Sequence, residues 1–282
     1  MSVATAVMLF LAALAGTAIN SVAGGGSFIA FPALLFAGVP PVTANATNSV
    51  ALWPGSVASA FAYRRELHGV RGLVPLSIAS FVGGVAGSIL LLETEESAFV
   101  VLIPWLMLFA ATLFTFGGPI ARKLRGRMGQ GGPGSLAAGV LAQLVVGVYG
   151  GYFGGGMGIM MLAILTVLGM TEMHEMNAVK TVLGALVNGV AVAAFVIAGA
   201  IAWAPGLVMV VGGIVGGYAG AAAARRVAAV HVRRVVLAVA WSMTLYFFIR
   251  TYAQHRGAAA EVAPPGILVH NGGRNLHPGS SS

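Results

Sequence analysis

The sequence predicts an all-α integral membrane protein, folded as an inverted 5+5 repeat helical bundle. Hydrophobic residues make up 58% of the chain and charged residues 8%, whereas a soluble domain carries roughly 25% charged residues. Several uncharged windows reach the length of about 20 residues that crosses a hydrocarbon core. A glycine triplet occurs twice, at 24–26 and 154–156, and interrupts an apolar stretch each time. Such a break, present once per half, is typical of the binding site of a secondary transporter.

Ten helical segments follow one another along the chain. They cover residues 3–23, 27–38, 44–63, 72–92, 97–117, 135–152, 157–169, 177–199, 203–224 and 232–251. The two segments that follow the triplets, 27–38 and 157–169, are too short to cross a membrane unaided, because a helix rises only about 1.5 Å per residue. We therefore expect two half-helices, each beginning directly after a Gly-rich break.

The repeat extends beyond the triplets. The offset between the copies is 130 at the triplets, 132 where residues 45–50 match 177–182, and 133 where 83–87 match 216–220. These matches divide the chain into a first repeat (1–117), a basic linker (118–134), a second repeat (135–252) and a tail (253–282). The tail is rich in Pro, Gly, Ser and Asn without apolar periodicity, so we expect it to be disordered.

The basic residues predict the orientation of the helices. Eleven of the 15 Lys and Arg residues lie in three connections, at 64–71, 122–127 and 225–234. Short basic loops face the cytoplasm, so the acidic 93–96 connection, the uncharged one before Trp203 and both termini are expected outside. Equivalent loops of the two repeats carry opposite charge bias, which predicts that the second repeat is inverted. The net charge of +8 is thereby assigned to topology and not to nucleic acid, and the chain is expected in the cell (inner) membrane.

The Gly-rich breaks are the first candidate site. Broken backbone inside a membrane is tolerated only where it lines a cavity or is buried in protein. Glycine lets N–H groups converge, and the following helix N-terminus favours an anion. Two facing anion cradles are therefore expected at Gly24, Gly25, Gly26 and Ser27, and at Gly154, Gly155 and Gly156. The alternative is that the triplets make only tight turns or close packing.

Polar residues at the start of segments 44–63 and 177–199 form the second candidate group. They are Asn45, Thr47 and Asn48 in the first copy and Asn177, Lys180 and Thr181 in the second. Lys180 occupies the position of Asn48 and is the only basic residue within a predicted span of the core, apart from the arginines at the two ends of segment 232–251, so it suits an anionic substrate. The alternative is that Lys180 extends its ammonium to the interface.

Other polar and small residues are expected to have structural roles. Asn20, Gln143 and Asn188 are expected to bond to neighbouring helices. Two glycine ridges, Gly83/Gly87 and Gly212/Gly216/Gly220, predict close helix packing.

Acidic residues are absent from the predicted spans. The chain has no Asp, and its seven Asp+Glu residues are all Glu in loops, at loop edges or in the tail. A cation path would lack its usual carboxylates. Glu172, His174 and Glu175 are expected in a solvated loop, with a proton relay as the alternative. No metal-ligand spacing is present and no nucleophile shares a membrane depth with an acid–base pair, so no cofactor and no enzymatic activity are expected.

The repeated motifs resemble a known family. The sequences AGGGSFIAFPALL and GGYFGGGMGIMML, each followed by Asn-Ala-x-x-[Ser/Thr]-Val, are similar to those of the TauE/SafE sulfite exporters, also called the 4-toluene sulfonate uptake permeases. The resemblance spans residues 5–251 and implies transport of sulfite, sulfoacetate, aryl sulfonates or other small organic anions. The second copy has Met157 and Gly158 where the first has Ser27 and Phe28, so the two cradles are not expected to be chemically equal.

Together these observations predict a secondary carrier for a small organosulfur or sulfur oxyanion that works by alternating access. Its expected partners are the anionic substrate and the lipid bilayer, with proton or ion coupling and a homodimer left open. A carrier of a small carboxylate, an anion channel with the same filter and a membrane-embedded enzyme or assembly factor are the alternatives.

Overall fold

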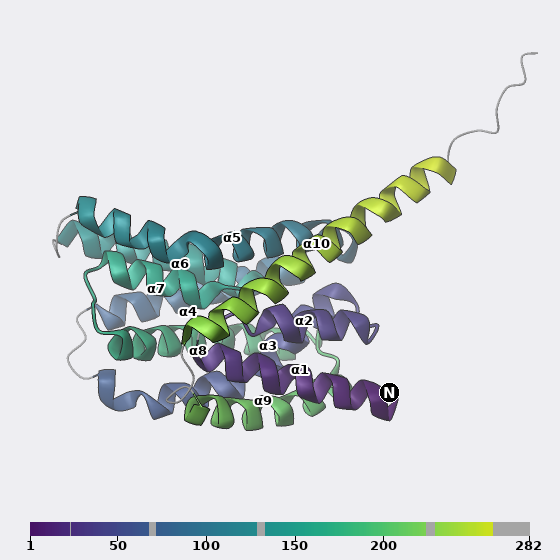
Figure 1. The fold of residues 1–282 in the computed structure, drawn as a ribbon, viewed down its shortest axis with the longest axis horizontal. Helices are drawn as coiled ribbons and strands as arrows, with labels where there is room; N and C mark the ends of the chain where they lie inside the picture. Colours follow the sequence, from purple (N-terminus) through teal and green to yellow (C-terminus); the bar gives the residue numbers. More distant parts are fainter. Residues whose placement is uncertain (23, 68–71, 129–132, 224–228, 262–282) are drawn as a thin grey trace, which may run out of the picture.

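The computed structural model describes residues 1–22, 24–67, 72–128, 133–223 and 229–261 (Figure 1). Every regular element in these ranges is helical. The elements are α1 (Val3–Val22), α2 (Ser27–Phe36), α3 (Pro41–Ala62), the 3₁₀ helix η1 (Arg64–Leu67), α4 (Leu73–Leu92), α5 (Glu96–Met128), α6 (Pro133–Tyr152), α7 (Met157–Val167), α8 (Met173–Ile197), α9 (Trp203–Ala223) and α10 (Ala229–Glu261).

The helix lengths confirm a multi-pass membrane protein with two short helices. Six described helices, α1, α4, α5, α8, α9 and α10, are long and apolar enough to cross a membrane. The helices α2 and α7 have only 10 and 11 residues, and each begins directly after a glycine triplet. The expectation of two half-helices that follow Gly-rich breaks is therefore confirmed.

Three helices begin three or four residues earlier than the sequence predicted, one of them α10, which begins at Ala229 instead of residue 232. The helix α3 begins at Pro41 instead of residue 44, because proline fits the first helical position, where its missing N–H costs nothing. The helix α8 begins at Met173 instead of 177. Glu175 lies in its first turn, where a negative charge is favoured. His174 and Glu175, expected in a loop, are thus part of a helix.

Two helices end later than predicted. The helix α5 continues to Met128, so residues 118–128, expected as linker, are helical. Basic residues are abundant in this stretch of the sequence, and they are favoured near the C-terminus of a helix. The helix α10 continues to Glu261, so residues 253–261, expected as part of a disordered tail, are helical too. Alanines 258–260 favour this extension. Residues 129–132 and 262–282 lie outside the described part of the chain.

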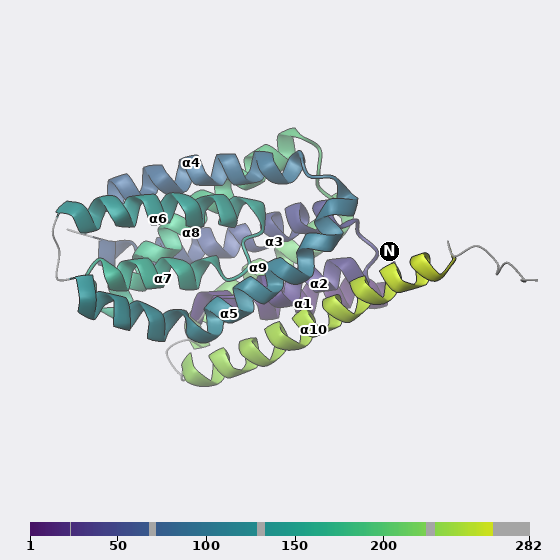
Figure 2. The same ribbon diagram turned by 90° about the horizontal axis from the view of Figure 1, so that it is seen from above.

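The helices pack into two units that do not coincide with the sequence halves. In the first unit α9 packs against α1 and α3, and α10 packs against α2. In the second unit α4 packs against α6 and α8, and α5 packs against α7. The first unit is thus α1, α2, α3, α9 and α10, and the second unit is α4 to α8. The units meet mainly where α3 lies against α8 and α5 lies against α10 (Figures 1 and 2). Each sequence half therefore lends its last two helices to the other half.

Glycines make the tightest contacts within both units. A Cβ added at Gly87 of α4 would collide with the backbone of Val148 on α6. A Cβ at Gly216 of α9 would collide with the backbone of Leu14 on α1. Gly83, Gly212 and Gly220 have equally close backbone neighbours. Close helix packing, as predicted for both glycine ridges, is confirmed.

The contact between α5 and α10 is built around a proline. Pro119 lies inside α5 and has no N–H to donate to the carbonyl of Thr115 four residues earlier. The Arg233 guanidinium of α10 donates to that oxygen over 3.1 Å and to the Phe114 carbonyl over 2.9 Å. Arg233 thus satisfies a backbone acceptor that the proline leaves free.

The connections at the two ends of the bundle carry different charged residues. Figure 1 shows α3 and α5 ending at the left, and α6 beginning there, whereas α1 begins at the right. Arg64 and Lys123 belong to η1 and the end of α5. Glu93 and Glu96 belong to the α4–α5 connection, at the right. The acidic α4–α5 connection therefore lies at the end opposite to Arg64 and Lys123, whereas Glu66 of η1 shares the end of those two residues.

Candidate functional site

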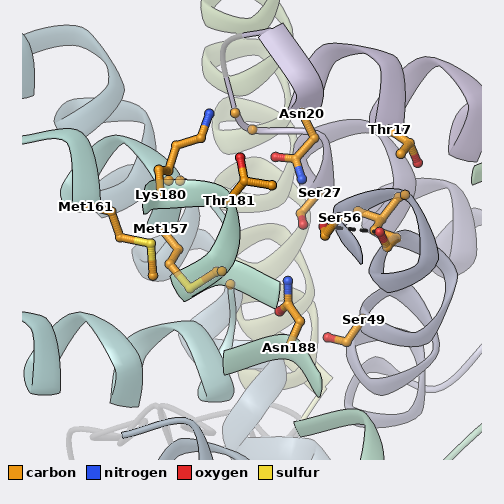
Figure 3. Close-up of a pocket in the computed structure, with 18 of the residues that line it drawn as sticks. Thr17, Asn20, Ser27, Ser49, Ser56, Met157, Met161, Lys180, Thr181 and Asn188 are labelled. Atoms are coloured by element: carbon orange, nitrogen blue, oxygen red, sulfur yellow. Dashed lines mark hydrogen bonds between the residues drawn. The ribbon is translucent and has the colours of Figure 1, made fainter. Parts of the chain in front are cut away.

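A cavity of about 60 Å³ lies between the two units, where the Gly-rich breaks meet. It has room for a few water molecules or one small ion. Its polar side chains are Thr17, Asn20, Ser27, Asn48, Ser49, Ser56, Ser59, Lys180, Thr181 and Asn188. Figure 3 shows Lys180, Met157 and Met161 on one side, Thr17, Ser49 and Ser56 on the other, and Asn20, Ser27 and Thr181 between them.

The backbone of the breaks explains why glycine is needed there. Gly24 and Gly154, which occupy equivalent positions, have φ angles of +80° and +76°, a region that residues with a Cβ rarely adopt. The next left-handed residue differs between the copies: it is Gly25 in the first and Gly156 in the second. These four glycines line the cavity, so the breaks face it and not the lipid.

Among the residues that the structure describes, Lys180 is the one charged side chain that lines the cavity. Only 6% of the residue is exposed, so its ammonium does not extend to the membrane surface. Among the described residues, no carboxylate forms an ion pair with the ammonium, and no acceptor receives a hydrogen bond from it. Its aliphatic stem passes close to Gly158, where an added Cβ would lie 3.4 Å from Lys180 Cδ. The glycine at the start of α7 therefore leaves room for the lysine.

Asn48 faces the cavity from the equivalent position of the first repeat. Its amide Nδ2 donates to Ser27 Oγ over 3.2 Å, so the start of α3 is tied to the start of α2. Its Oδ1 atom is buried and has no hydrogen-bond partner. Such an orphaned buried polar atom is unusual, and it lies within the packed protein.

Eight of the thirteen predicted site residues line the cavity. They are Gly24, Gly25, Ser27, Asn48, Gly154, Gly156, Lys180 and Thr181. The other five lie behind it or beside it, and several have a structural partner.

Asn45 and Thr47 hold the bundle together and do not line the cavity. Asn45 Nδ2 donates to the Tyr152 carbonyl over 2.8 Å, which fixes the end of α6 just before the second break. Thr47 Oγ1 accepts from the Ala202 amide over 3.0 Å. Both side chains are almost fully buried. Asn177, which occupies the position of Asn45 in the second copy, accepts a hydrogen bond from the Thr181 hydroxyl through its backbone carbonyl.

Gly26 and Gly155 also have structural roles. A Cβ at Gly26 would collide with the Gly16 carbonyl of α1, so Gly26 allows α1 and α2 to approach. The Gly155 carbonyl accepts a hydrogen bond from the Tyr149 hydroxyl over 2.7 Å. The contacts of these two glycines agree with the alternative expectation, in which the triplets make only tight turns or close packing.

Six polar residues of the cavity were not predicted as site residues: Thr17, Asn20, Ser49, Ser56, Ser59 and Asn188. Asn20 and Asn188 were expected to bond to neighbouring helices, but they line the cavity instead. Gln143, predicted with them, does make an interhelical bond, from Nε2 to Ser80 Oγ on α4 over 2.8 Å. The repeat offset of 132 places Thr181 on Ser49 and Asn188 on Ser56. A comparison of polar residues at equivalent positions would have found these two pairs.

The chemistry of the cavity favours an anion. It contains one cation, several amide and hydroxyl groups and no carboxylate. In the part of the chain that the structure describes, no three His, Asp or Glu side chains gather as metal ligands would. A small anion is the ligand that compensates the buried charge of Lys180.

Comparisons with known proteins agree with this geometry. The profile of a family described as "Sulfite exporter TauE/SafE" matches residues 8–247. The chain is 30% identical over 238 residues to a "Probable membrane transporter protein" of Haemophilus influenzae, covering 84% of this chain and 92% of that protein. It is 29% identical over 211 residues to "Probable membrane transporter protein YfcA" of Escherichia coli K12, covering 74% and 77%. No solved structure matches the chain.

Proposed function

This chain belongs to the TauE/SafE sulfite exporter family of membrane transporters, and from that premise we propose that it is a secondary carrier of a small anion. The favoured substrates are sulfur oxyanions and organosulfur anions, such as sulfite, sulfoacetate or another sulfonate. The proposed site comprises the cavity-lining residues around Lys180, Asn48 and the two Gly-rich breaks.

One observation carries this proposal: the buried, unpaired ammonium of Lys180 in a cavity without carboxylates. An ionisable side chain inside a membrane is costly and usually marks a substrate or ion path. The position of Lys180 between two broken helices matches the arrangement in which transporters bind substrates.

The proposed movement is a rocking of the first unit against the second. The cavity lies between these units, with Asn48 and Ser27 on one side and Lys180 and Thr181 on the other. The main contacts that join the units are those of α3 with α8 and of α5 with α10. The proposal assigns alternating access to these exchanged units and not to the sequence halves.

We interpret the halves as inverted repeats. The exchange of α4 and α9 between the units, the matched polar pairs of the cavity, and the opposite directions of α1 and α6 in Figure 1 support this interpretation. The basic end of the bundle is proposed to face the cytoplasm of the cell (inner) membrane.

Cysteine labelling tests this orientation. The chain contains no Cys, so single substitutions report cleanly. An impermeant maleimide added to intact cells is expected to label Glu95→Cys and to leave Arg64→Cys unlabelled until the cells are opened. The reverse pattern would overturn the proposed orientation.

Flux in proteoliposomes tests the transport activity. Purified protein is reconstituted with unlabelled sulfite, methanesulfonate or propanoate inside, and uptake of the same labelled anion is measured. Saturable counterflow is expected for a sulfur anion. Current without counterflow would instead indicate a channel, and counterflow of propanoate alone would indicate a carboxylate carrier.

Lysine substitutions link this flux to the cavity. The sequence has two lysines, Lys180 and Lys123, and Lys123 is exposed near the end of α5. Lys180→Met is expected to abolish counterflow, whereas the matched control Lys123→Met is expected to retain it. Equal activity of both variants would overturn the site assignment.

A further inference from the structure

The cavity contains more information about its ligand than a preference for anions. The two copies of the repeat contribute different charges to the cavity. Lys180 faces it from α8, and the neutral Asn48 faces it from the equivalent position of α3. We propose that the cavity selects singly charged anions over doubly charged ones, and that the residue at position 48 sets this limit. This inference rests on the proposed function as an anion carrier, and it narrows the proposed substrates to singly charged sulfur anions, such as hydrogen sulfite and simple sulfonates, because sulfoacetate carries two negative charges at neutral pH.

The first argument is the count of full charges. Lys180 is the one charged side chain that lines the cavity, and only 6% of the residue is exposed. A monoanion pairs with its ammonium and leaves no net charge behind. A dianion leaves one buried negative charge uncompensated, which costs several kcal/mol even after relaxation.

The second argument is that several of the cavity hydroxyls already use their protons, although Ser27, which accepts from Asn48, keeps its O–H free. Ser49 donates to the Asn45 carbonyl over 3.1 Å, and Ser56 donates to the Leu52 carbonyl over 3.3 Å. Thr181 donates to the Asn177 carbonyl over 2.6 Å. These oxygens therefore turn lone pairs, and not O–H donors, toward the cavity. They suit a neutral or hydrogen-bearing part of the ligand and oppose a second negative charge.

The third argument concerns the N-termini of α2 and α7. They contribute partial positive charge, about half an elementary charge each at most. Amides at both helix starts are already bonded within the breaks, however: Phe28 N to the Gly25 carbonyl over 3.1 Å, and Met157 N to the Gly154 carbonyl over 3.3 Å. The helix ends therefore supplement Lys180 but do not replace a second cation.

The fourth argument is that Asn48 occupies, in the first copy, the position that Lys180 occupies in the second copy. It is 2% exposed, and its Oδ1 atom is buried without a partner. A neutral amide at this position supplies no positive charge to compensate a second negative charge of a ligand. The first copy thus carries an acceptor oxygen at the position where the second copy carries a cation.

The test compares anions that differ by one charge at nearly constant shape. Methanesulfonate and sulfate are one pair, and propanoate and malonate are the other. Counterflow of the labelled monoanion is measured in proteoliposomes at fixed ionic strength and at a pH at which sulfate and malonate are dianions. The unlabelled dianion is then added as a competitor. In the wild-type protein, we expect the dianion to compete at least roughly tenfold more weakly than the monoanion, because it leaves a buried charge unpaired.

Three variants separate charge from shape. Asn48→Lys adds a second cation and is expected to bring sulfate within about threefold of methanesulfonate. The double variant Asn48→Lys/Lys180→Asn moves the single cation to the other unit and is expected to retain the monoanion preference. Phe28 occupies the position of Gly158 in the first copy and is fully buried, so a lysine introduced at position 48 has less room than Lys180. Asn188→Lys therefore provides a second way to add the cation, for the case in which Asn48→Lys does not fold.

The outcomes distinguish the two proposals. If the wild-type protein shows no counterflow of any anion, the carrier assignment and the charge limit are both overturned. Equal competition by monoanions and dianions in the wild-type protein overturns only the charge limit. An unchanged monoanion preference in folded Asn48→Lys and Asn188→Lys variants also overturns it, because the added cation would then have no effect on selection.

Discussion

The indole Nε1 of Trp53 donates a hydrogen bond to the carbonyl oxygen of Ala185 over 3.1 Å, and the two residues occupy equivalent positions at the repeat offset of 132. This bond joins α3 to α8, one of the two main contacts between the units. Trp53 also lies against Gly189, where an added Cβ would be 3.1 Å from Nε1. The centre of the bundle is therefore a place where a residue contacts its own counterpart.

Replacement of Trp53 by Phe removes this bond and keeps an aromatic ring. We expect a loss of about 0.6–1 kcal/mol of stability, the usual worth of an interhelical hydrogen bond in a membrane protein, together with a changed transport rate. Thermal unfolding in detergent and counterflow measure the two effects. Trp105→Phe is the matched control, because Trp105 is half exposed and its ring contact with Phe248 is available to Phe as well. An equal effect of both substitutions would contradict a special role of the α3–α8 contact.

Gly158 is predicted to control the position of the Lys180 side chain. A Cβ at Gly158 would lie in ordinary contact, 3.4 Å from Lys180 Cδ, so Gly158→Ala is expected to bind anions almost normally. Gly158→Val places methyl groups in the space of the lysine stem and is expected to raise the half-saturation concentration of uptake by up to about 10²-fold, the cost that a misplacement of about 1 Å can have at other sites. Uptake measured over a range of substrate concentrations checks this series. A normal half-saturation value in a folded Gly158→Val variant would show that the lysine stem does not depend on this space.

The glycines at the closest helix contacts are predicted to determine stability. Gly87→Ala and Gly216→Ala each place a Cβ against the backbone of a neighbouring helix. We expect each to cost about 1–3 kcal/mol, the range for overpacking, and to lower the unfolding temperature in detergent. Gly118→Ala in α5 is the control, because no atom lies within 4 Å of an added Cβ there. Similar melting of all three variants would contradict this assignment.

Arg233 and Pro119 are predicted to be energetically coupled. Arg233 donates to the Thr115 carbonyl, which lacks its usual helical donor because residue 119 is proline. Arg233→Met is expected to cost about 1.5–3 kcal/mol, as loss of a hydrogen bond from a charged donor does. In a Pro119→Ala background residue 119 regains its N–H, so the cost is expected to be smaller. A double-mutant cycle of unfolding free energies measures the difference, and a coupling of zero would contradict this explanation of the contact.

Most of the helical framework could be predicted from the sequence because the determining signals are local. Hydrophobic length indicated the long helices, and the triplets indicated the two short ones. The starts of α3 and α8 were missed because a proline at the first helical position, Pro41, and a negative charge in the first turn, Glu175, favour a helix that extends into residues that are not apolar. The ends of α5 and α10 were missed for a related reason: helix propensity and dipole interactions continue beyond the apolar stretch.

The site was predictable in part, for a different reason. Lys180 and Asn48 were found because a polar residue within an apolar segment is conspicuous. Their neighbours Asn45 and Thr47 share that signal, yet they point to Tyr152 and Ala202. One turn of helix or less separates a cavity residue from a structural one, and only the contacts of α3 with the end of α6 and with the residue before α9 decide between them. The weakly polar Ser49 and Ser56 do not stand out in a sequence, although their repeat partners Thr181 and Asn188 also line the cavity.

The exchange of α4 and α9 has a consequence for the origin of this architecture. A chain that ended near residue 117 would present the bare Gly83 and Gly87 face of α4 to lipid, and its own α1 and α3 would lack the helix that covers them. Such a fragment cannot complete a compact unit by itself. Under the proposed inverted relation of the halves, an ancestor of that length would have needed a second copy inserted into the bilayer in the opposite orientation, so insertion in both directions would have preceded the fusion into one gene.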